Sequence, residues 1–316
     1  MVEIKNIIPL LSFFAKNIER LEDIINGGSE RKFYRIWTKD KTYIVLQNND
    51  FEDTNLFIST NKILLTHKIN VPKIIKYNEK IIIQEDLGNN CLLDIALADN
   101  EEMIMYYYKK AINELIKFQT IDRSNFSKMK NFDNKQMLKD VLYFEEYYLK
   151  NLNLKIDFWD EIFDWIDEME KSVKSVIYRD FQGRNIMIKN NNVYLIDYQG
   201  YMFGLPQYDI ASLLFQAKAR LHIKIKETLF LYYHNNIKKH IHNIDNELFI
   251  FNYENTILLR ILQTLGSYGK RGLIERKKHF LESLPFALKQ LSENIPLFTT
   301  LSNKPKFLNL LLKITK

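Results

Sequence analysis

Apolar and polar positions follow two different periods along the 316-residue chain. Near its start, apolar residues recur every three or four positions from Ile4 to Ile25, which predicts an amphipathic helix over residues 4–25. Gly27 and Gly28 follow, and glycine readily takes the backbone conformation that ends a helix. The first element is therefore expected to be a helix that stops before residue 29.

Between residues 29 and 87 the pattern changes to short runs that are typical of β-strands. The runs 30–38 and 42–47 flank a short polar turn and predict one hairpin. A second hairpin is predicted over 71–88, and the segment 52–68 between the hairpins has the period of a helix. We expect a small sheet with one helix inserted after the second strand of these hairpins.

From Gly88 onward the chain is predicted to be mostly helical. Helical periodicity covers three long segments, 91–121, 134–172 and about 209–316. Short apolar runs predict three strands between the second and third of these segments, 176–178, 186–189 and 193–197. Proline cannot continue a helix, so Pro285 and Pro296 predict breaks in the last helical segment.

Composition narrows the class of protein. A chain with 46% hydrophobic residues can bury one large core or two smaller ones. A net charge of +6 without a recognisable nucleic-acid-binding motif predicts no nucleic-acid partner. The single cysteine, Cys91, excludes a disulfide within the chain and fits a reducing compartment. No apolar run reaches the roughly 18 residues that a bilayer requires, so we expect a cytoplasmic protein without a membrane partner.

The segment 177–185, IYRDFQGRN, places several polar side chains between two apolar strand-like runs. Asp180 and Asn185 have the spacing D-x-x-x-x-N, and Asp197 ends the next predicted hairpin. Asn185 and Asp197 offer the oxygen ligands that Mg²⁺ prefers, while Asp180 can accept a proton from an attacking hydroxyl. These groups suit phosphoryl transfer, which depends mainly on positioning and charge neutralisation. Alternatively, Asp180 and Asn185 are turn residues that bond their own backbone.

The stretch YRDFQGRNIM, followed by LIDYQG, resembles the catalytic and metal-binding loops of the protein-kinase-like superfamily. The resemblance is to its aminoglycoside phosphotransferase branch, and within that branch to bacterial amino-sugar (N-acetylmuramate/N-acetylglucosamine) kinase-like phosphotransferases. SERKFYRI is similar to the nucleotide loop of that group, and QEDLG to the hinge between its two lobes. LPQYDIASLL and the late helical run are also similar to the group, so the resemblance covers nearly the whole chain.

The resemblance implies an α+β fold with two lobes. A small five-stranded antiparallel β lobe would occupy residues 1–87, and a larger, mostly helical lobe would occupy residues 88–316. It also implies Mg²⁺ as cofactor, ATP or GTP as co-substrate and a small, sugar-like molecule as acceptor. The oligomeric state stays open.

Carried over to this sequence, the resemblance assigns a role to each candidate residue. Asp180 would be the catalytic base, and Asn185 and Asp197 would bind magnesium. Arg184 in the same loop would face the acceptor or the γ-phosphate, although a plain surface charge is an equal alternative. Six residues would contact the nucleotide, the last two through their backbone: Ser29, Arg31, Lys32, Gln47, Glu85 and Leu87.

One position departs from the superfamily pattern. The superfamily carries a lysine on the third strand that contacts the nucleotide phosphates, and the matching residue here is Gln47, which has no charge. Arg31 and Lys32 are the nearest candidates to supply the missing cation. A helix glutamate normally pairs with the lysine, and Glu52 or Asp53 lies near that position.

Two further residues are expected to support the loop rather than to react. Asp209 would cap the start of a helix and brace the catalytic loop, and Arg179 would pair with a carboxylate in the helical lobe.

The acceptor is predicted from charge. Basic residues are frequent from Arg260 to Lys278, and helices there would form a wall of the acceptor pocket. A neutral or anionic sugar then fits better than a polycationic aminoglycoside. Gln199 and Tyr201 are further candidates to reach the acceptor. Alternatives are a kinase of aminoglycosides or other alcohols and a non-catalytic nucleotide-binding module. A protein kinase is disfavoured because the segment after Asp197 is short.

Overall fold

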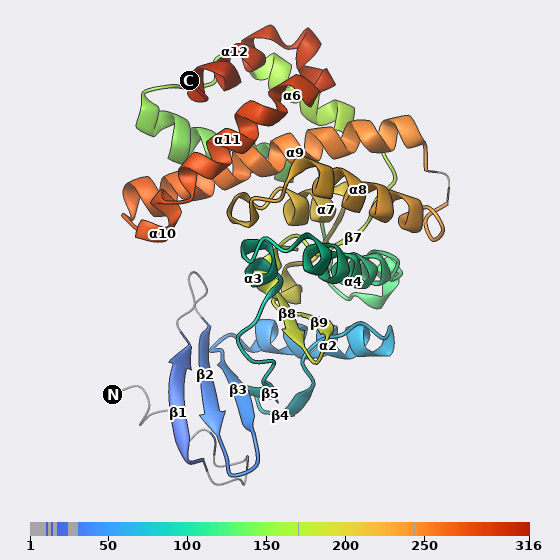
Figure 1. Ribbon diagram of the computed structural model, residues 1–316, viewed down its shortest axis with the longest axis vertical. Coiled ribbons are helices and arrows are strands. Elements are labelled where there is room, and N and C mark those ends of the chain that lie inside the picture. The colour runs from blue at the N-terminus through green and yellow to red at the C-terminus, as the bar shows by residue number, and fades with distance from the viewer. Residues whose placement is uncertain (1–10, 12–13, 15–17, 25–30, 170, 243) are drawn as a thin grey trace. The chain divides into compact units, whose positions relative to one another are not determined.

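The computed structural model describes all residues except 1–10, 12–13, 15–17, 25–30, 170 and 243 (Figure 1). Contacts within the chain define two compact units. The first unit comprises residues 1–90 together with 186–199, and the second comprises 91–185 and 200–316. The sequence suggested a single boundary after residue 87, whereas the contacts group the later hairpin, 186–199, with the first unit.

The first unit is built on a five-stranded antiparallel sheet with the strand order β1-β2-β3-β5-β4. Its strands are β1 (Arg20–Ile24), β2 (Lys32–Trp37), β3 (Thr42–Gln47), β4 (Ile74–Tyr77) and β5 (Ile81–Glu85). Helix α2 (Phe51–Thr66) is inserted between β3 and β4, in the predicted place. The predicted small antiparallel lobe is confirmed.

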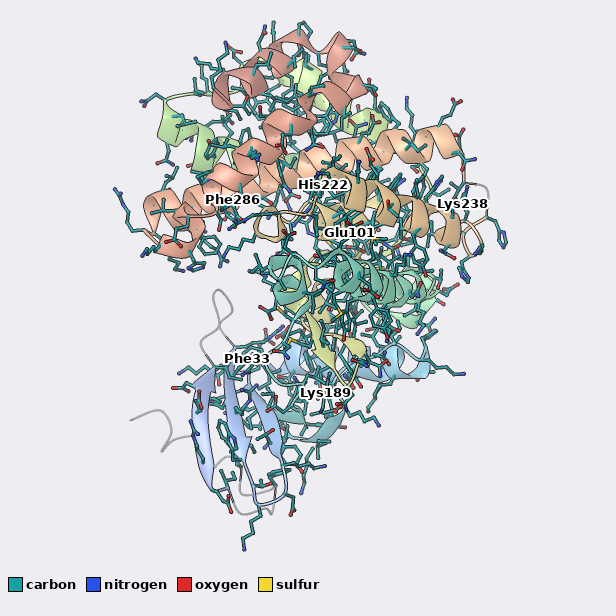
Figure 2. All side chains as sticks on the ribbon, in the orientation of Figure 1. Phe33, Glu101, Lys189, His222, Lys238 and Phe286 are labelled. Carbon is teal, nitrogen blue, oxygen red and sulfur yellow. The ribbon has the colours of Figure 1, made fainter. Side chains whose placement is uncertain are left out.

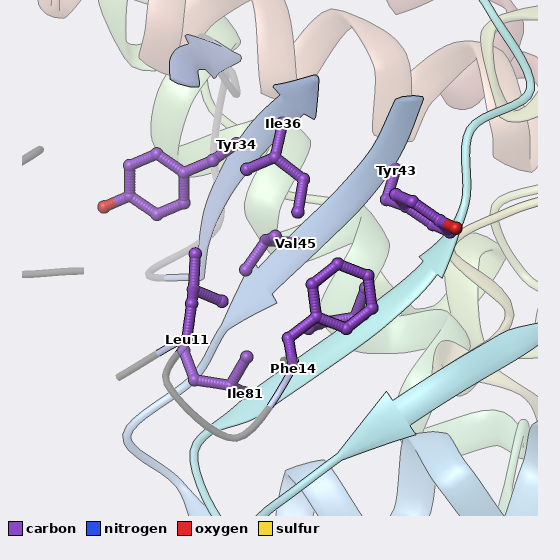
Figure 3. Close-up of a cluster of buried hydrophobic side chains, with 8 residues drawn as sticks. Leu11, Phe14, Tyr34, Ile36, Tyr43, Val45 and Ile81 are labelled. Carbon is purple, nitrogen blue, oxygen red and sulfur yellow. The ribbon is translucent and has the colours of Figure 1, made fainter. Parts of the chain in front are cut away.

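One face of this sheet carries the core of the first unit (Figure 3). Tyr34 and Val45 lie opposite each other in the β2–β3 register, and Ile83 lies opposite Val45 on the other side. Leu11 and Phe14 pack on these side chains, and the Phe14 ring meets the Tyr43 ring edge-on at 5.1 Å. Because strand side chains alternate between faces, every second residue of β2 and β3 contributes to this core.

The predicted helix over 4–25 is wrong for its last described residues. Arg20–Ile24 forms strand β1, which pairs along its whole length with β2. The spacing of Ile18, Leu21 and Ile24 suits one face of a helix, but the adjacent strand edge offers a row of backbone hydrogen bonds that a helix would leave unused. Most of residues 1–17 and the predicted stop at 27–28 lie outside the described residues.

Local signals set the ends of the elements next to the site. The Asp50 carboxylate caps α2 by accepting the Asp53 N–H at 3.0 Å. The strands β8 (Ile186–Lys189) and β9 (Asn192–Leu195) form the predicted hairpin. Asn190 and Asn191 both have positive φ, as a two-residue hairpin turn requires, and asparagine tolerates that conformation.

The second unit is mostly helical, as predicted. Its principal helices are α3 (Leu92–Leu97), α4 (Glu101–Gln119), α5 (Asn134–Phe144), α6 (Trp159–Met169), α7 (Gln207–Leu214), α8 (Ile223–Ile237), α9 (Asn246–Tyr268), α10 (Lys278–Leu281), α11 (Leu284–Asn294) and α12 (Pro305–Ile314). The predicted helical segment 134–172 is interrupted after residue 152, where Asn153 adopts positive φ. Pro285 lies in the first turn of α11, where a missing N–H costs nothing.

A short three-stranded sheet leads into the segment 178–185. β7 (Ser175–Ile177) pairs with β10 (Met202–Gly204), which also pairs with β6 (Lys130–Asn131). β6 and β10 were not predicted, because two or three residues are too few to show a period. Among the described helices, none combines the length and the apolarity that crossing a membrane requires.

Candidate active site

The backbone turns sharply where β7 leads into the segment 178–185. Tyr178 is fully buried, and Arg179 has a φ of 78°, which is costly for a residue with a side chain. Phe181 is again fully buried, and residues 183–185 form a 3₁₀ turn. The two buried aromatic rings anchor the loop on both sides of Asp180, which is half-buried.

Asp209 holds this strained turn in place. Its carboxylate accepts the N–H groups of Tyr178 at 2.7 Å and Arg179 at 2.8 Å. Gln119 donates a third hydrogen bond, at 3.0 Å, from helix α4. The predicted brace is therefore confirmed. The predicted helix cap is wrong, because α7 begins two residues earlier and Asp209 lies inside its first turn.

The buried position of Asp209 predicts a pH-dependent stability. Burial raises the pKa of Asp209 from 3.8 to about 6, although the N–H groups of Tyr178 and Arg179 partly oppose the shift. The folded protein therefore binds a proton at Asp209 more tightly than the unfolded chain between about pH 4 and pH 6. The contribution of this group to the free energy of unfolding must then fall as the pH rises through that window.

We expect the stability of the unmodified protein, relative to Asp209→Asn, to fall by about 3 kcal/mol between pH 4 and pH 7. Asparagine does not titrate, so the difference between the two proteins isolates this one group. Urea unfolding at several pH values measures it. A difference that stays constant across the window would contradict the pKa shift.

Arg179 pairs with a carboxylate of the second unit, as predicted. Two nitrogens of its guanidinium bond the Asp140 carboxylate at 3.0 and 3.2 Å. The guanidinium also lies over the rings of Phe132 and Tyr208, at 4.5 and 5.0 Å from their centroids. The Arg179 guanidinium therefore forms an ion pair and packs on two rings, which supports a structural role for this residue.

Asp180 and Asn185 are brought together by the backbone of their own loop. The Asn185 side-chain amide donates to the Asp180 carbonyl at 2.9 Å, and the Gln182 N–H donates to the same oxygen at 2.9 Å. This bond assigns the nitrogen end of the Asn185 side chain to the loop and turns its oxygen end away. The Asp180 carboxylate has a weaker partner, the Gln182 amide at 3.3 Å.

Asp197 belongs to the first unit and follows strand β9. It has a φ of 65°, and its side chain is 51% exposed. Gln199 donates to its carboxylate at 2.7 Å. The next residue, Tyr198, is fully buried, lies against the Phe57 ring and receives a hydrogen bond from Asn61 at 2.8 Å. The strained turn thus buries Tyr198 and leaves the Asp197 carboxylate accessible.

Arg31 is held close to Asp197 within the same unit. Its Nε and Nη2 bond the two oxygens of Asp53 at 2.7 and 2.6 Å. Its Nη1 lies 3.9 Å from the Asp197 carboxylate. Asn48 donates to Asp53 at 2.6 Å, so two donors fix that carboxylate. Of the two candidate partners, Asp53 forms the ion pair, whereas Glu52 is exposed one position earlier.

Gln47 and Lys32 do not join this group. They are direct partners in the β2–β3 register, and Gln47 accepts a hydrogen bond from the Tyr34 hydroxyl at 3.3 Å. Gln47 therefore lies on the sheet face that carries the Leu11 and Phe14 core, and Lys32 is exposed. Ser29 lies outside the described residues.

Three charged residues that were not singled out from the sequence, Lys189, Arg35 and Asp86, form ion pairs or hydrogen bonds at the predicted hinge. Lys189, labelled in Figure 2, bonds the Glu85 carboxylate and the Asp86 carbonyl, both at 2.8 Å. Arg35 forms an ion pair with the buried Asp86 carboxylate, with Nε 2.7 Å from one oxygen, and its Nη2 donates to the other oxygen at 3.1 Å. The Glu85 N–H donates to the Lys73 carbonyl at 2.9 Å, so that donor is not available to a purine. An arginine within the otherwise aromatic and apolar run Phe33–Trp37 is the sequence signal that could have indicated Arg35.

Arg184 lies in a positively charged part of the second unit. It is exposed, and its charge acts on Lys218 and on the Tyr268 hydroxyl. Burial, reinforced by the Arg184 guanidinium, lowers the pKa of Lys218, and Glu282 only partly offsets this. Lys218 was not singled out from the sequence, because nothing in its local spacing marks it.

Two other basic residues of the C-terminal segment are buried or paired with a carboxylate. Arg260 is buried and donates to the Tyr208 hydroxyl at 2.7 Å. Lys277 pairs with Glu275 at 2.8 Å. The prediction that this segment lines an acceptor pocket therefore fails for Arg260. Tyr201 is also buried, against the ring of Phe126, which argues against contact with an acceptor.

The oxygen donors suit magnesium better than a metal that needs a complete protein cage. Within the described ranges, no three His, Cys, Asp or Glu side chains group closely enough to hold a metal ion. Magnesium keeps several waters and phosphate oxygens and needs only one or two protein ligands. Within the first unit, the exposed carboxylate of Asp197 is a side-chain oxygen of that kind.

Comparison with known proteins places the chain in a family. A profile described as the phosphotransferase enzyme family (APH) matches residues 21–239, which contain both Asp180 and Asp197. The chain belongs to this family. The matched residues also include both members of the Arg31–Asp53 pair of this APH protein.

Relatives of this APH protein are distant in sequence. An N-acetylmuramate/N-acetylglucosamine kinase from Neisseria meningitidis is 24% identical over 196 residues, which cover 58% of this chain and 58% of that enzyme. The matched part is thus less than two thirds of the relative's length.

Solved structures share the fold across nearly the whole chain. A choline/ethanolamine kinase family protein from Mesorhizobium loti has a TM-score of 0.66, with 11% identity, covering 95% of this chain and 97% of its own. A spectinomycin phosphotransferase, solved with ADP and spectinomycin, has a TM-score of 0.62, with 14% identity, covering 90% of this chain and 93% of its own. The predicted protein-kinase-like fold is confirmed.

Proposed function

We propose that this APH protein is a magnesium-dependent kinase that transfers the γ-phosphate of ATP or GTP to a hydroxyl group of a sugar-like acceptor. The observation that carries the proposal is the braced catalytic loop. Asp209 fixes the strained turn at Arg179, while the Asp180 carboxylate keeps only a weak partner at 3.3 Å. A carboxylate that is held by its backbone and lightly bonded at its side chain suits a base that accepts the acceptor's proton.

Each remaining group has a role in this proposal. Asn185 and Asp197 would hold magnesium, which neutralises charge on the phosphates when bound. The backbone of Leu87 would bond the purine edge, since the Glu85 N–H is committed to the sheet. The protein's own contribution is then to orient the acceptor hydroxyl toward Asp180 and to fix the nucleotide near Asp197.

The acceptor is proposed to be an amino sugar of cell-wall metabolism. The Neisseria kinase supports this class by its name. Charge supports it independently, because Arg184 and Lys218 add positive charge next to the catalytic loop. A polycationic aminoglycoside would be repelled there, whereas a neutral sugar or one bearing a carboxylate would not.

Release of nucleoside diphosphate from Mg·ATP and Mg·GTP tests the function directly. The acceptors would be N-acetylmuramate, N-acetylglucosamine, an aminoglycoside and choline. We expect turnover with the N-acetylated amino sugars only. Turnover confined to the aminoglycoside or to choline would assign the chain to the alternative kinases. Nucleotide binding without turnover on any acceptor would favour a non-catalytic module and overturn the proposal.

The charges at Arg184 and Lys218 predict how the enzyme distinguishes acceptors. We expect Arg184→Gln and Lys218→Gln each to raise KM for N-acetylmuramate roughly tenfold, because each removes a charge-assisted hydrogen bond to its carboxylate. KM for the uncharged N-acetylglucosamine should change much less. Lys224→Gln, at an exposed position of α8, is the matched control. Equal effects on both sugars would show that neither residue recognises the carboxylate.

A further inference from the structure

Gln47 brings no positive charge, but the first unit carries one at Arg31, immediately before strand β2. Gln47 lies opposite Lys32 and Ile81 in the sheet register, and it shares its face with Val45 and the core. A one-residue step along a strand reverses the face of every side chain. Asn48, the next residue, accordingly reaches the Asp53 carboxylate at 2.6 Å. The group at Asp53 thus gathers on the side of the sheet opposite to Gln47.

The Arg31–Asp53 pair is built as a fixed support. The Arg31 side chain is 13% exposed and the Asp53 side chain 27%. Both bonds from Arg31 to Asp53 are short, and planar two-point pairing fixes the orientation of a guanidinium as well as its position. Asp53 is itself fixed, because its N–H is capped by Asp50 and its carboxylate accepts from Asn48. Arg31 therefore has little freedom to turn.

The orientation of Arg31 presents its third nitrogen to Asp197. Nε and Nη2 are turned to Asp53, while Nη1 lies 3.9 Å from the Asp197 carboxylate. That separation is longer than a hydrogen bond. Asp197 is the more exposed partner, at 51%, so a phosphate group could reach its carboxylate from solvent.

We propose that Arg31 binds the phosphates of the nucleotide and that Asp53 positions it, in place of the lysine that Gln47 lacks. The inference rests on the proposed function for the identity of the ligand, a nucleoside triphosphate with magnesium. Magnesium held at Asp197 would neutralise that carboxylate and charge on the phosphates. The guanidinium would then meet the phosphates through Nη1, while Asp53 keeps the rest of it in place. Asp53 acts only through Arg31 and is a positioning residue.

A plain structural ion pair between the start of β2 and the start of α2 is the competing explanation. Such a pair would contribute modestly to stability, because it is partly exposed, and would leave nucleotide affinity unchanged. The two explanations therefore differ in binding, not in folding.

Binding of Mg·ATP, measured by calorimetry without any acceptor, separates them. We expect Arg31→Gln to raise Kd at least tenfold and Arg31→Lys to retain part of the affinity. Asp53→Asn should raise Kd by a smaller factor, and the double variant Arg31→Gln with Asp53→Asn should bind as Arg31→Gln does. Lys39→Gln, at an exposed position of the turn before β3, is the matched control and should bind as the unmodified protein does. Lys32→Gln and Gln47→Met test the rival candidates, and both should bind within about twofold of the unmodified protein.

Thermal unfolding of every variant shows whether a loss of binding results from a loss of folding. If Arg31→Gln does not fold, the Kd of Arg31→Lys provides the test. Unchanged Kd in a folded Arg31→Gln or Arg31→Lys would overturn the proposal. So would a large effect of Gln47→Met or Lys32→Gln, or a further loss in the double variant. The binding measurement contains no acceptor. A lack of turnover with every acceptor would therefore overturn the proposed function, but it would leave the binding result for Arg31 unchanged.

Discussion

Replacing Asp180 with asparagine should lower kcat by a factor of about 10² to 10⁴, the range typical for removal of a general base. The loop itself should survive, because its hydrogen bonds from Gln182 and Asn185 go to the backbone carbonyl of Asp180 and not to its carboxylate. We therefore expect the free energy of unfolding and the Kd for Mg·ATP to stay close to those of the unmodified protein. Diphosphate release with an N-acetylated amino sugar measures the rate.

Asp164→Asn is the matched control for this prediction, since Asp164 is an exposed aspartate of helix α6 in the same unit. Its kcat should equal that of the unmodified protein. If Asp180→Asn retained full activity, the base would have to be another group. If it lost nucleotide binding as well, the carboxylate would have a role in the ground state that the proposed mechanism does not give it.

Truncation of Asp209 to alanine should have the largest effect on stability, about 3 to 5 kcal/mol. The change leaves the buried N–H groups of Tyr178 and Arg179 without their acceptor, and it also removes a partner of Gln119. The positive φ at Arg179 then loses the contacts that compensate for it. Urea unfolding at pH 7 measures the loss of stability.

Asp209→Ala should also lower kcat, because the loop that carries Asp180 loses its support. Asp209→Asn provides the comparison, because an amide keeps one oxygen acceptor and should cost less than alanine. Asp164→Ala, at the exposed site on α6, should cost less than about 0.5 kcal/mol. Equal costs for alanine at the two positions would show that Asp209 does not brace the loop.

Residues that act through short-range spacing were predictable from the sequence. The D-x-x-x-x-N spacing of Asp180 and Asn185 located the loop of the candidate site, and Asn190 and Asn191 marked the hairpin turn. The brace at Asp209 was expected from the resemblance of LPQYDIASLL to the family, and a carboxylate partner was expected for Arg179. The spacings depend on neighbours in sequence, whereas the brace depends on the resemblance.

Features that depend on distant partners were not predictable. Ile18, Leu21 and Ile24 suit a helix as well as a strand, and only the free edge of β2 decides between them. The face on which Gln47 lies depends on register, which a single sequence does not define. Arg184 and Lys218 are more than thirty positions apart in sequence. No local pattern therefore indicates that the charge of Arg184 acts on Lys218.

Helix α2 carries three of the residues that define the first unit's part of the site, and they recur every four positions. Asp53 holds Arg31, Phe57 packs on Tyr198, and Asn61 bonds the Tyr198 hydroxyl. Residues spaced in this way share one side of a helix. One side of a single helix therefore sets the position of both the Arg31 guanidinium and the turn that carries Asp197.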